Sequence, residues 1–397
     1  MKLTGMICTG LCMQRISFFY VYIYIIPALL SLVLIASGGT LLGDFRSYSY
    51  SIDPIDFFLT LMQFLLPLAF IFLVIKTGDK LVITKGRGTV FECFLLTLFV
   101  FIFLVTFFIG AIKVGSSNVG GLPGLLMSFV FKLNPYLLLG LLAFSNIKAK
   151  HFVFCLLVCI LYSFKQVSLQ GYLVSLFSLV TFILLRKNIS NKLFFFVLIV
   201  PFFIHSFIFD VLIDIYTLRN QMRGVAFDSS QIMSLAVGRI SSLSSYLYIR
   251  ESLTTSFEGV SDYFSLGIFL ERLSGFSVFN TVSPSVVFNK AELGAADYSI
   301  FLGLNGFLLA LYKSSVLIFM FNVTVLLLVF LIIFQMLPYF DRKARVHMFF
   351  LIMYMPILSF DIWEISIVFQ SIILINVLFL LYRGAYVFFF KRSLSRI

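Results

Sequence analysis

Charged side chains are scarce in this sequence. Lys, Arg, Asp and Glu together make up 12% of its 397 residues, while 61% of the residues are hydrophobic. A soluble globular domain has about 25% charged and about 45–50% apolar residues. Because no soluble core of this length could bury so many apolar side chains, the composition excludes an ordinary soluble protein. Lipid must be the solvent for most of the chain.

Metal-binding and nucleotide-binding motifs are absent as well. The five cysteines form no CxxC pair and the three histidines are scattered, which argues against a disulfide framework and a zinc site. There is no Walker loop for ATP, no HExxH for metal-dependent hydrolysis and no DxD-like pair for a metal-bound nucleotide sugar. The two halves also lack the internal repeat that is common in secondary transporters. We therefore expect no metal and no cofactor.

Ten apolar stretches are long enough, or nearly so, to cross the hydrocarbon core as helices of about 20 residues. Only helices are expected, because an open strand would leave backbone groups unpaired in lipid. The predicted spans are 16–37, 56–75, 90–112, 124–144, 151–165, 168–185, 193–211, 314–337, 347–361 and 365–382. The first lacks a small-residue cleavage site and is expected to be retained rather than removed as a signal peptide. The fold class is predicted to be an all-α polytopic membrane protein.

Basic residues are distributed unevenly among the connections. With the N-terminus inside, the short outer connections hold only Arg46, Lys113 and Lys165. The inner connections and the two ends hold eighteen: Lys2, Arg15, Lys76, Lys80, Lys85, Arg87, Lys148, Lys150, Arg186, Lys187, Lys192, Arg342, Lys343, Arg345, Arg383, Lys391, Arg392 and Arg396. Because positive charge accumulates on the cytoplasmic side, this bias predicts both termini in the cytoplasm. Topology thus explains most of the net charge of +12, and no nucleic-acid partner is expected.

The segment 210–313 breaks the series of spans, because no stretch within it can cross the membrane and parity places it outside. We therefore divide the chain into an N-terminal transmembrane bundle of about seven spans (1–209), a large outer loop with amphipathic helices (210–313), and C-terminal transmembrane helices with a basic cytoplasmic tail (314–397). The apolar end of the loop, 299–312, is too short to cross alone. It is predicted to be an interfacial or re-entrant helix.

Spaced arginines make the outer loop the leading candidate for chemistry. Arg219 and Arg223 are four residues apart, so on a helix they share one face with Cβ atoms about 6 Å apart. Two guanidinium groups at this spacing match the oxygens of a diphosphate in geometry and charge. A pair of surface arginines near anionic lipid headgroups is the simpler alternative.

Arg239 and Arg250 lie in the stretch 232–250, whose apolar residues recur at helical spacing. On a continuous helix these arginines return to nearly one face, about 16 Å apart along the axis. The pattern predicts an amphipathic helix on the membrane surface, and a purely structural helix is the alternative. Arg272 follows Glu271, so it either pairs with this neighbour or joins the substrate site.

Polar residues in and between the spans add further candidates. Lys165, Gln166 and Gln170 fill the tight turn between the fifth and sixth spans, where Lys165 would face the same space as the loop arginines, unless it only reaches toward headgroups. Lys132 lies inside the fourth span, where an ionisable side chain indicates function or a structural polar contact, with a carboxylate as the expected partner. His205 is interpreted as a buried, hydrogen-bonded imidazole rather than a base. Several outer carboxylates are candidates for a general base, and spacing singles out none of them: Asp44, Asp53, Asp56, Asp361 and Glu364.

This layout resembles the Wzy-type O-antigen polymerases, which have about ten spans, both ends inside and one large outer loop with spaced arginines. The likeness is carried by the loop sequences TLRNQMRG and GRISSLSSYLYIRE and by the apolar run LGLNGFLLALY that follows them. The outer sequence GDFRSYSYS, which contains Asp44 and Arg46, is similar to the acidic, tyrosine-bearing loop after the first span of EpsG-type polysaccharide proteins.

The resemblance implies a metal-independent glycosyltransferase of GT-C-like architecture at the periplasmic face of a bacterial inner membrane. It would polymerise oligosaccharide repeat units, with undecaprenyl-diphosphate-linked oligosaccharide as both donor and acceptor. Preorganised cations would stabilise the leaving diphosphate. The residues implied for this are Arg219, Arg223, Arg239 and Arg250, with Lys165, Gln170, Arg272, Asp44 and Arg46 in the substrate site.

The same resemblance implies a flippase and a chain-length regulator of the pathway as partners, together with the membrane lipid itself. An O-antigen ligase or another lipid-dependent glycosyltransferase shares this layout and remains an alternative. A lipid-linked oligosaccharide flippase or another carrier is the rival of a different class, although such proteins usually have about twelve spans and short loops.

Overall fold

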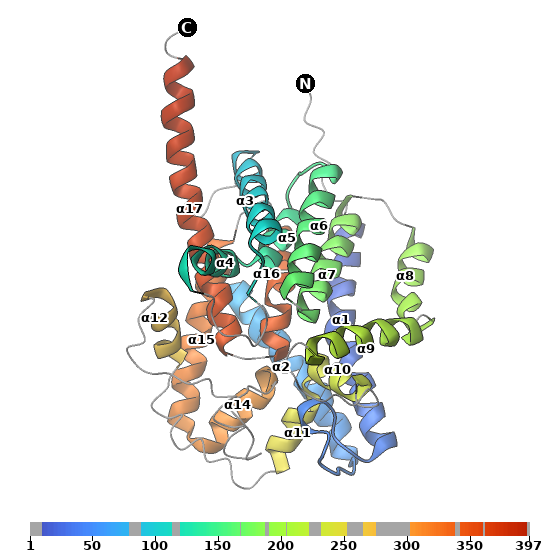
Figure 1. The fold of residues 1–397 in the computed structure, drawn as a ribbon. Coiled ribbons are helices and arrows are strands. Elements are labelled where there is room, and N and C mark those ends of the chain that lie inside the picture. Colours follow the sequence, from blue (N-terminus) through green and yellow to red (C-terminus); the bar gives the residue numbers. More distant parts are fainter. Residues whose placement is uncertain are drawn as a thin grey trace.

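The computed structural model describes residues 10–78, 89–112, 120–166, 168–186, 190–203, 205–221, 232–251, 265–274, 302–337, 342–359 and 362–394. These residues are nearly all helical (Figure 1). Within them, six helical stretches are long and apolar enough to cross a membrane: Gln14–Gly38, Thr89–Phe108, Gly121–Ala143, Ala149–Gln166, Val316–Met336 and Glu364–Ala385. Length and composition thus support an all-α membrane protein with several spans.

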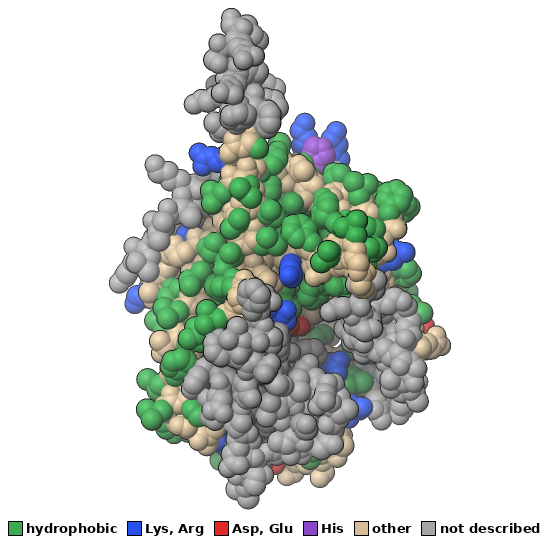
Figure 2. Space-filling model, turned by 60° about the vertical axis from the view of Figure 1, so that its left-hand side comes forward, with side chains coloured by type: hydrophobic (Ala, Val, Ile, Leu, Met, Phe, Trp, Pro, Cys, Tyr) green, Lys and Arg blue, Asp and Glu red, His purple; other side chains and the backbone are tan. Residues whose placement is uncertain are grey.

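Most of the predicted spans coincide with one helix each. These helices are α1 (Gly10–Gly38), α2 (Pro54–Gly78), α3 (Thr89–Phe108), α6 (Ala149–Gln166), α7 (Leu169–Arg186), α15 (Val316–Met336), α16 (Arg342–Ser359) and α17 (Ile362–Leu394). With its 33 residues, α17 is about 50 Å long and extends beyond the rest of the bundle (Figure 1). Hydrophobic side chains cover much of the coloured surface in Figure 2, as expected for contact with lipid.

Two predicted spans are each divided into two helices. The fourth consists of α4 (Gly121–Leu133) and α5 (Pro135–Ala143), which meet at Asn134 in a left-handed conformation with φ +49°. The seventh consists of α8 (Asn191–Phe203) and α9 (His205–Gln221), and α9 lies across the direction of α8 (Figure 1). The span predicted over 124–144 is thus found as the apolar stretch Gly121–Ala143, but its helix is interrupted at Asn134. Proline has no N–H to donate and disfavours an α-helical residue before it, so the chain turns at Asn134.

The predicted amphipathic stretch 232–250 also departs from one long helix. The stretch 232–250 forms α10 (Ile232–Ser241) and α11 (Leu243–Glu251), separated by Ser242 with φ +52°. The continuous helix expected to align Arg239 with Arg250 is therefore absent. α14 (Gly303–Ser314) is a separate 12-residue helix that ends before Ser315, whose backbone is extended. As predicted for 299–312, α14 is too short to cross a membrane by itself.

The two ends of the molecule differ in what they contain. The first residues of α1 and the last residues of α17 lie at one end, and α11 and α14 lie toward the other (Figure 1). α10 packs against α1, α11 against α14, and α12 (Ser265–Ser274) against α17. The described helices of the segment 210–313 therefore pack on the bundle.

Two arginines counted among the inner basic residues are bound to the ends of helices. Arg345 is 1% exposed and donates to the carbonyls of Phe334 and Gln335 at the end of α15, at 2.9 and 2.7 Å. Arg186 donates to backbone carbonyls that follow α5 and stacks on the Phe182 ring at 4.0 Å. Cations near a helix C-terminus satisfy its free carbonyls and oppose its negative dipole end. Both charges therefore hold neighbouring helices together.

Candidate functional site

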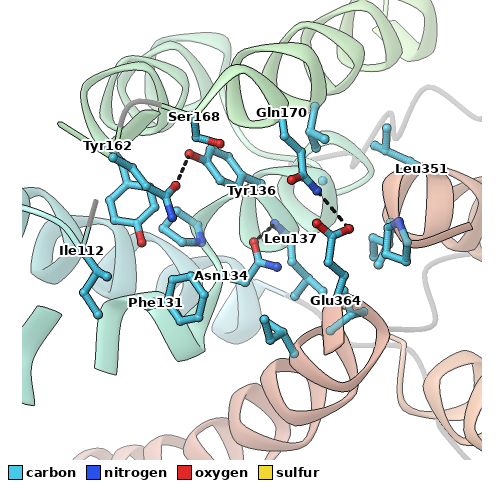
Figure 3. A pocket seen from close by; sticks show the side chains of 18 residues that line it. Ile112, Phe131, Asn134, Tyr136, Leu137, Tyr162, Ser168, Gln170, Leu351 and Glu364 are labelled. Carbon is cyan, nitrogen blue, oxygen red and sulfur yellow. Dashed lines mark hydrogen bonds between the residues drawn. The ribbon is translucent and has the colours of Figure 1, made fainter. Parts of the chain in front are cut away.

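A cavity of about 380 Å³ lies at the junction between α4 and α5 (Figure 3). Its other walls come from the α6–α7 turn, from α16 and from the first turns of α17. Most of the lining is apolar, and its polar members are Asn134, Tyr136, Tyr162, Gln166, Ser168, Gln170 and Glu364. A few convergent polar groups in a largely apolar hollow are typical of a small-molecule site.

The break between α4 and α5 shapes one side of this cavity. Asn134 tolerates the left-handed conformation because its short polar side chain bonds locally. Its Oδ1 accepts a hydrogen bond from the Leu137 N–H at 3.2 Å and so caps the start of α5. Both Asn134 and Pro135 line the cavity. The turn therefore opens the space that a continuous helix would fill.

Hydrogen-bonded polar side chains from α5 and α6 form one wall of the cavity. The Tyr136 hydroxyl donates to Gln166 Oε1 at 3.0 Å and accepts from Ser163 Oγ at 3.0 Å. Gly171 lies so close that a Cβ there would overlap the Tyr136 hydroxyl. These contacts hold the Gln166 amide in one orientation, which is how a binding site is preorganised.

The opposite wall carries a carboxylate. Gln170 Nε2, from α7, lies 3.5 Å from Glu364 Oε2, in the first turn of α17 (Figure 3). Glu364 is the single acidic residue among those that line the cavity, and none of them is Lys or Arg. A carboxylate in such surroundings can accept a hydrogen bond or a proton from a bound hydroxyl. The structure thus brings the predicted substrate residue Gln170 next to one of the candidate bases.

Tyr162 adds a buried polar atom to the cavity lining. Its side chain is 1% exposed, and its hydroxyl has no hydrogen-bond partner among the residues that the structure describes. Buried polar groups are normally hydrogen-bonded, so each exception needs a physical reason. A ligand or a water molecule in the cavity would supply the partner.

A second polar cluster joins the loop between α1 and α2 to α10 and α11. Arg239 contacts Asp44 Oδ1 through Nη2 at 2.7 Å and through Nε at 3.1 Å. The Asp44 side chain is 7% exposed. Burial lowers the pKa of Arg239, but the Asp44 carboxylate and Tyr216 together raise it above its ordinary value. Arg239 therefore remains a cation and is paired with Asp44.

Arg250 forms the other half of this cluster. Its guanidinium binds the fully buried carboxylate of Asp56 and donates to the Tyr50 hydroxyl at 2.8 Å. Asp56 also accepts from the Asp53 backbone N–H at 2.8 Å, which caps the start of α2. Lys313 at the end of α14 donates to the backbone carbonyl of Arg250 at 2.9 Å. We refer to Asp44, Asp56, Arg239 and Arg250 as the clasp.

The clasp depends on a close approach of two backbones. Gly238, just before Arg239, lies so near that a Cβ there would overlap backbone atoms of Gly43. Gly43 itself has φ +71°, a conformation that favours glycine. Beside it, the Leu42 N–H donates to Ser244 Oγ at 2.8 Å. Both arginines thus tie the loop to the helices, and each guanidinium already binds a carboxylate.

The remaining predicted site residues lie in different parts of the structure. Arg219 lies in α9, and Arg223 lies outside the described residues. Lys165 is exposed and directly precedes Gln166, which lines the cavity. Arg46 is exposed and donates to the Gly43 carbonyl at 3.1 Å. Arg272 lies in the last turn of α12, and its carbonyl accepts from Gln370 of α17 at 2.6 Å.

Two candidates within the predicted spans, Lys132 and His205, gain little support from the structure. Lys132 is exposed at the end of α4, and its carbonyl accepts from Ser371 Oγ at 2.6 Å. The ion pairs between described residues involve only arginines, so the carboxylate partner expected for Lys132 is not found in this part of the chain. His205 begins α9. No group of three or more potential metal ligands occurs in the described ranges.

Sequence reasoning missed the cavity because its residues are far apart in the chain. One signal was present: Asn134–Pro135 is a turn-forming dipeptide inside an otherwise apolar stretch. Tyr136 and Tyr162 carried no comparable signal, because they are ordinary residues of the fourth and fifth predicted spans.

Comparison of the chain with protein-family models, with curated proteins and with solved structures gave no match. The function proposed below therefore rests on the residues and their arrangement.

Proposed function

We propose that this protein polymerises lipid-linked oligosaccharide repeat units at the outer face of a bacterial inner membrane. The proposal includes ten spans, cytoplasmic termini and a GT-C-like architecture. The observation that carries it is the carboxylate of Glu364, which faces the Gln170 amide in a mainly apolar cavity. By the predicted topology, both residues lie on the outer side, where a lipid-linked sugar is presented.

The proposed reaction is a glycosyl transfer without a metal ion. An acceptor sugar hydroxyl gives its proton to the Glu364 carboxylate, and its oxygen bonds to the anomeric carbon of the donor chain. The bond between that carbon and the diphosphate oxygen breaks, and the lipid diphosphate leaves with the electron pair. Cations stabilise the negative charge that gathers on the leaving group. We assign this role to Arg219 and Arg223, assisted by Lys165, because Arg239 and Arg250 are already paired.

The polysaccharide ladder on a gel tests this proposal in the source bacterium. Deletion of the gene should leave lipid A–core bearing at most one repeat unit, because single units are still flipped and ligated. Loss of a ligase would instead leave bare core with polymer retained on the lipid carrier. A normal ladder in the deletion strain would refute polymerisation by this protein.

The assignment of the outer arginines has its own test. Arg223→Ala should collapse the ladder, whereas Arg223→Lys should retain part of it, because lysine keeps the charge but not the two-pronged geometry. Protein amount in the membrane is the control for both variants. An unchanged ladder in both would remove Arg223 from the site.

A carrier for lipid-linked oligosaccharide is the second candidate, and the break at Asn134 favours it. Discontinuous spans that line a cavity are common at the binding sites of secondary transporters. Loss of such a carrier would leave bare core and would leave lipid-linked repeat units on the cytoplasmic side. Measuring which leaflet holds these units in the deletion strain separates the two functions.

A further inference from the structure

We propose that the cavity is a saccharide subsite that seats one neutral sugar ring, and that the buried Tyr162 hydroxyl is one of its hydrogen-bond partners. Identifying this ring as the acceptor sugar rests on the proposed function. The binding itself does not.

The lining of the cavity favours a neutral occupant over a diphosphate. Among the lining residues, none is Lys or Arg, and Glu364 is the acidic one. A diphosphate would therefore find no cationic side chain in the lining to bind its oxygens. The same carboxylate is a good acceptor for the hydroxyl group of a neutral ligand.

The polar groups of the cavity fit a polyol. Tyr162 and Ser168 offer hydroxyls, Gln166 and Gln170 offer amides, and Glu364 offers a carboxylate (Figure 3). A sugar hydroxyl both donates and accepts, so it can match every one of these groups. The unpartnered hydroxyl of Tyr162 is the strongest sign of a ligand, because a buried polar group without a hydrogen bond is destabilising.

The apolar part of the lining and the size of the cavity restrict the ligand further. The rings of Phe131, Tyr136 and Tyr162 all line the space and suit the C–H faces of a pyranose. A volume of 380 Å³ is near the lower end of the roughly 300–1,000 Å³ found for small-molecule sites. It suits one ring rather than a whole repeat unit or a polyprenyl chain.

The single tryptophan of the chain, Trp363, allows direct measurement because it is next to Glu364 in the sequence. The full-length protein in a detergent without sugar groups is titrated with methyl glycosides of glucose, galactose, mannose and N-acetylglucosamine, and with sodium pyrophosphate. We expect at least one glycoside to change Trp363 fluorescence saturably and pyrophosphate to have no effect. Response to none of the glycosides, or displacement of the glycoside by pyrophosphate, would overturn the proposal.

Tyr162→Phe provides the decisive variant, because it removes only the unpartnered oxygen. It should weaken glycoside binding about tenfold, which corresponds to one hydrogen bond. Without ligand it should unfold at the same temperature as the wild type or higher, since the orphan hydroxyl is gone. The matched control is Tyr22→Phe, which loses a bond to the Leu198 carbonyl but should bind the glycoside normally. Unchanged binding by Tyr162→Phe would refute the subsite.

The two proposals fail in different ways. Saccharide binding that depends on Tyr162, together with an intact ladder in the deletion strain, would refute polymerisation and leave the subsite standing. A ladder lost on deletion but normal in Tyr162→Phe, with normal binding, would refute the subsite alone.

Discussion

The arginines predicted to bind a diphosphate have different surroundings, and this changes their expected roles. Arg239 and Arg250 each contact a carboxylate that is 7% exposed or fully buried. An ion pair in such a place is costly to break from one side, because the remaining charge stays buried and unpaired. We therefore expect Arg239 and Arg250 to act first as ties between the outer loop and the helices.

Exchanging the charges of one clasp pair tests this structural role. Asp44→Arg and Arg239→Asp should each cost about 3 kcal/mol, because each leaves two like charges together. The double exchange should recover much of this loss, since it restores an ion pair. Thermal unfolding of the purified proteins measures both effects. Additive losses in the double variant would show that the two side chains do not act as a pair.

The proposed proton transfer depends on the single carboxylate of Glu364. Glu364→Gln keeps the shape and the hydrogen bond but removes the base, so polymerisation should fall roughly 100-fold or more. Glu92→Gln is the matched control, because Glu92 accepts from the Asn146 N–H at 2.7 Å away from the cavity and its replacement can still accept. The ladder and the membrane content of each variant are compared. A normal ladder in Glu364→Gln would exclude it as the base.

Two breaks between helices set the positions of the cavity and of the clasp. Asn134 separates α4 from α5 beside the cavity, and Ser242 separates α10 from α11 within the clasp region. Each junction residue has a positive φ, which costs about 1–2 kcal/mol for an ordinary side chain. Such conformations persist when the surrounding structure requires them. At each break, the turn therefore directs side chains of neighbouring helices toward one site, the cavity at Asn134 and the clasp at Ser242.

The junction at Asn134 can be tested by substitution. Asn134→Gly should preserve both the fold and glycoside binding, because glycine adopts this conformation without strain. Asn134→Val should cost about 1–2 kcal/mol and should weaken binding, because a β-branched residue disfavours positive φ. Unfolding temperature and glycoside titration provide the measurements. Equal behaviour of the two variants would show that the turn does not determine the cavity.

For the whole molecule, the main feature is the difference between its two ends. The beginning of α1 and the end of α17 share one end, where the predicted cytoplasmic charges belong (Figure 1). The clasp joins the loop after α1 to α10 and α11 at the other end. This arrangement agrees with an even number of spans and an outer segment 210–313, both of which remain predictions.

Single cysteines introduced into a variant without native cysteines test this orientation. Ser47→Cys, exposed in the loop after α1, should react with a membrane-impermeant maleimide in intact cells. Ala149→Cys, exposed at the start of α6, should react only after the membrane is opened. Labelling of Ala149→Cys in intact cells would reverse the topology and place the clasp on the cytoplasmic side.

Composition and the apolar stretches determined the fold class of this protein from the chain alone. The apolar stretches specified most of the helices, because each span must satisfy its own backbone hydrogen bonds in lipid. Gln170 was recognised as a candidate from its place in a short outer turn. These inferences depend on local sequence, which is why they could be made from the chain alone.

Only the tertiary structure decided which polar residues meet. Arg239 pairs with Asp44, and Gln170 meets Glu364, across sequence separations of 195 and 194 residues. The unpartnered hydroxyl of Tyr162 is likewise visible only once the neighbouring helices are in place. Such contacts depend on how helices pack and where they break. No local pattern encodes them, because many helix arrangements bury the same apolar faces equally well.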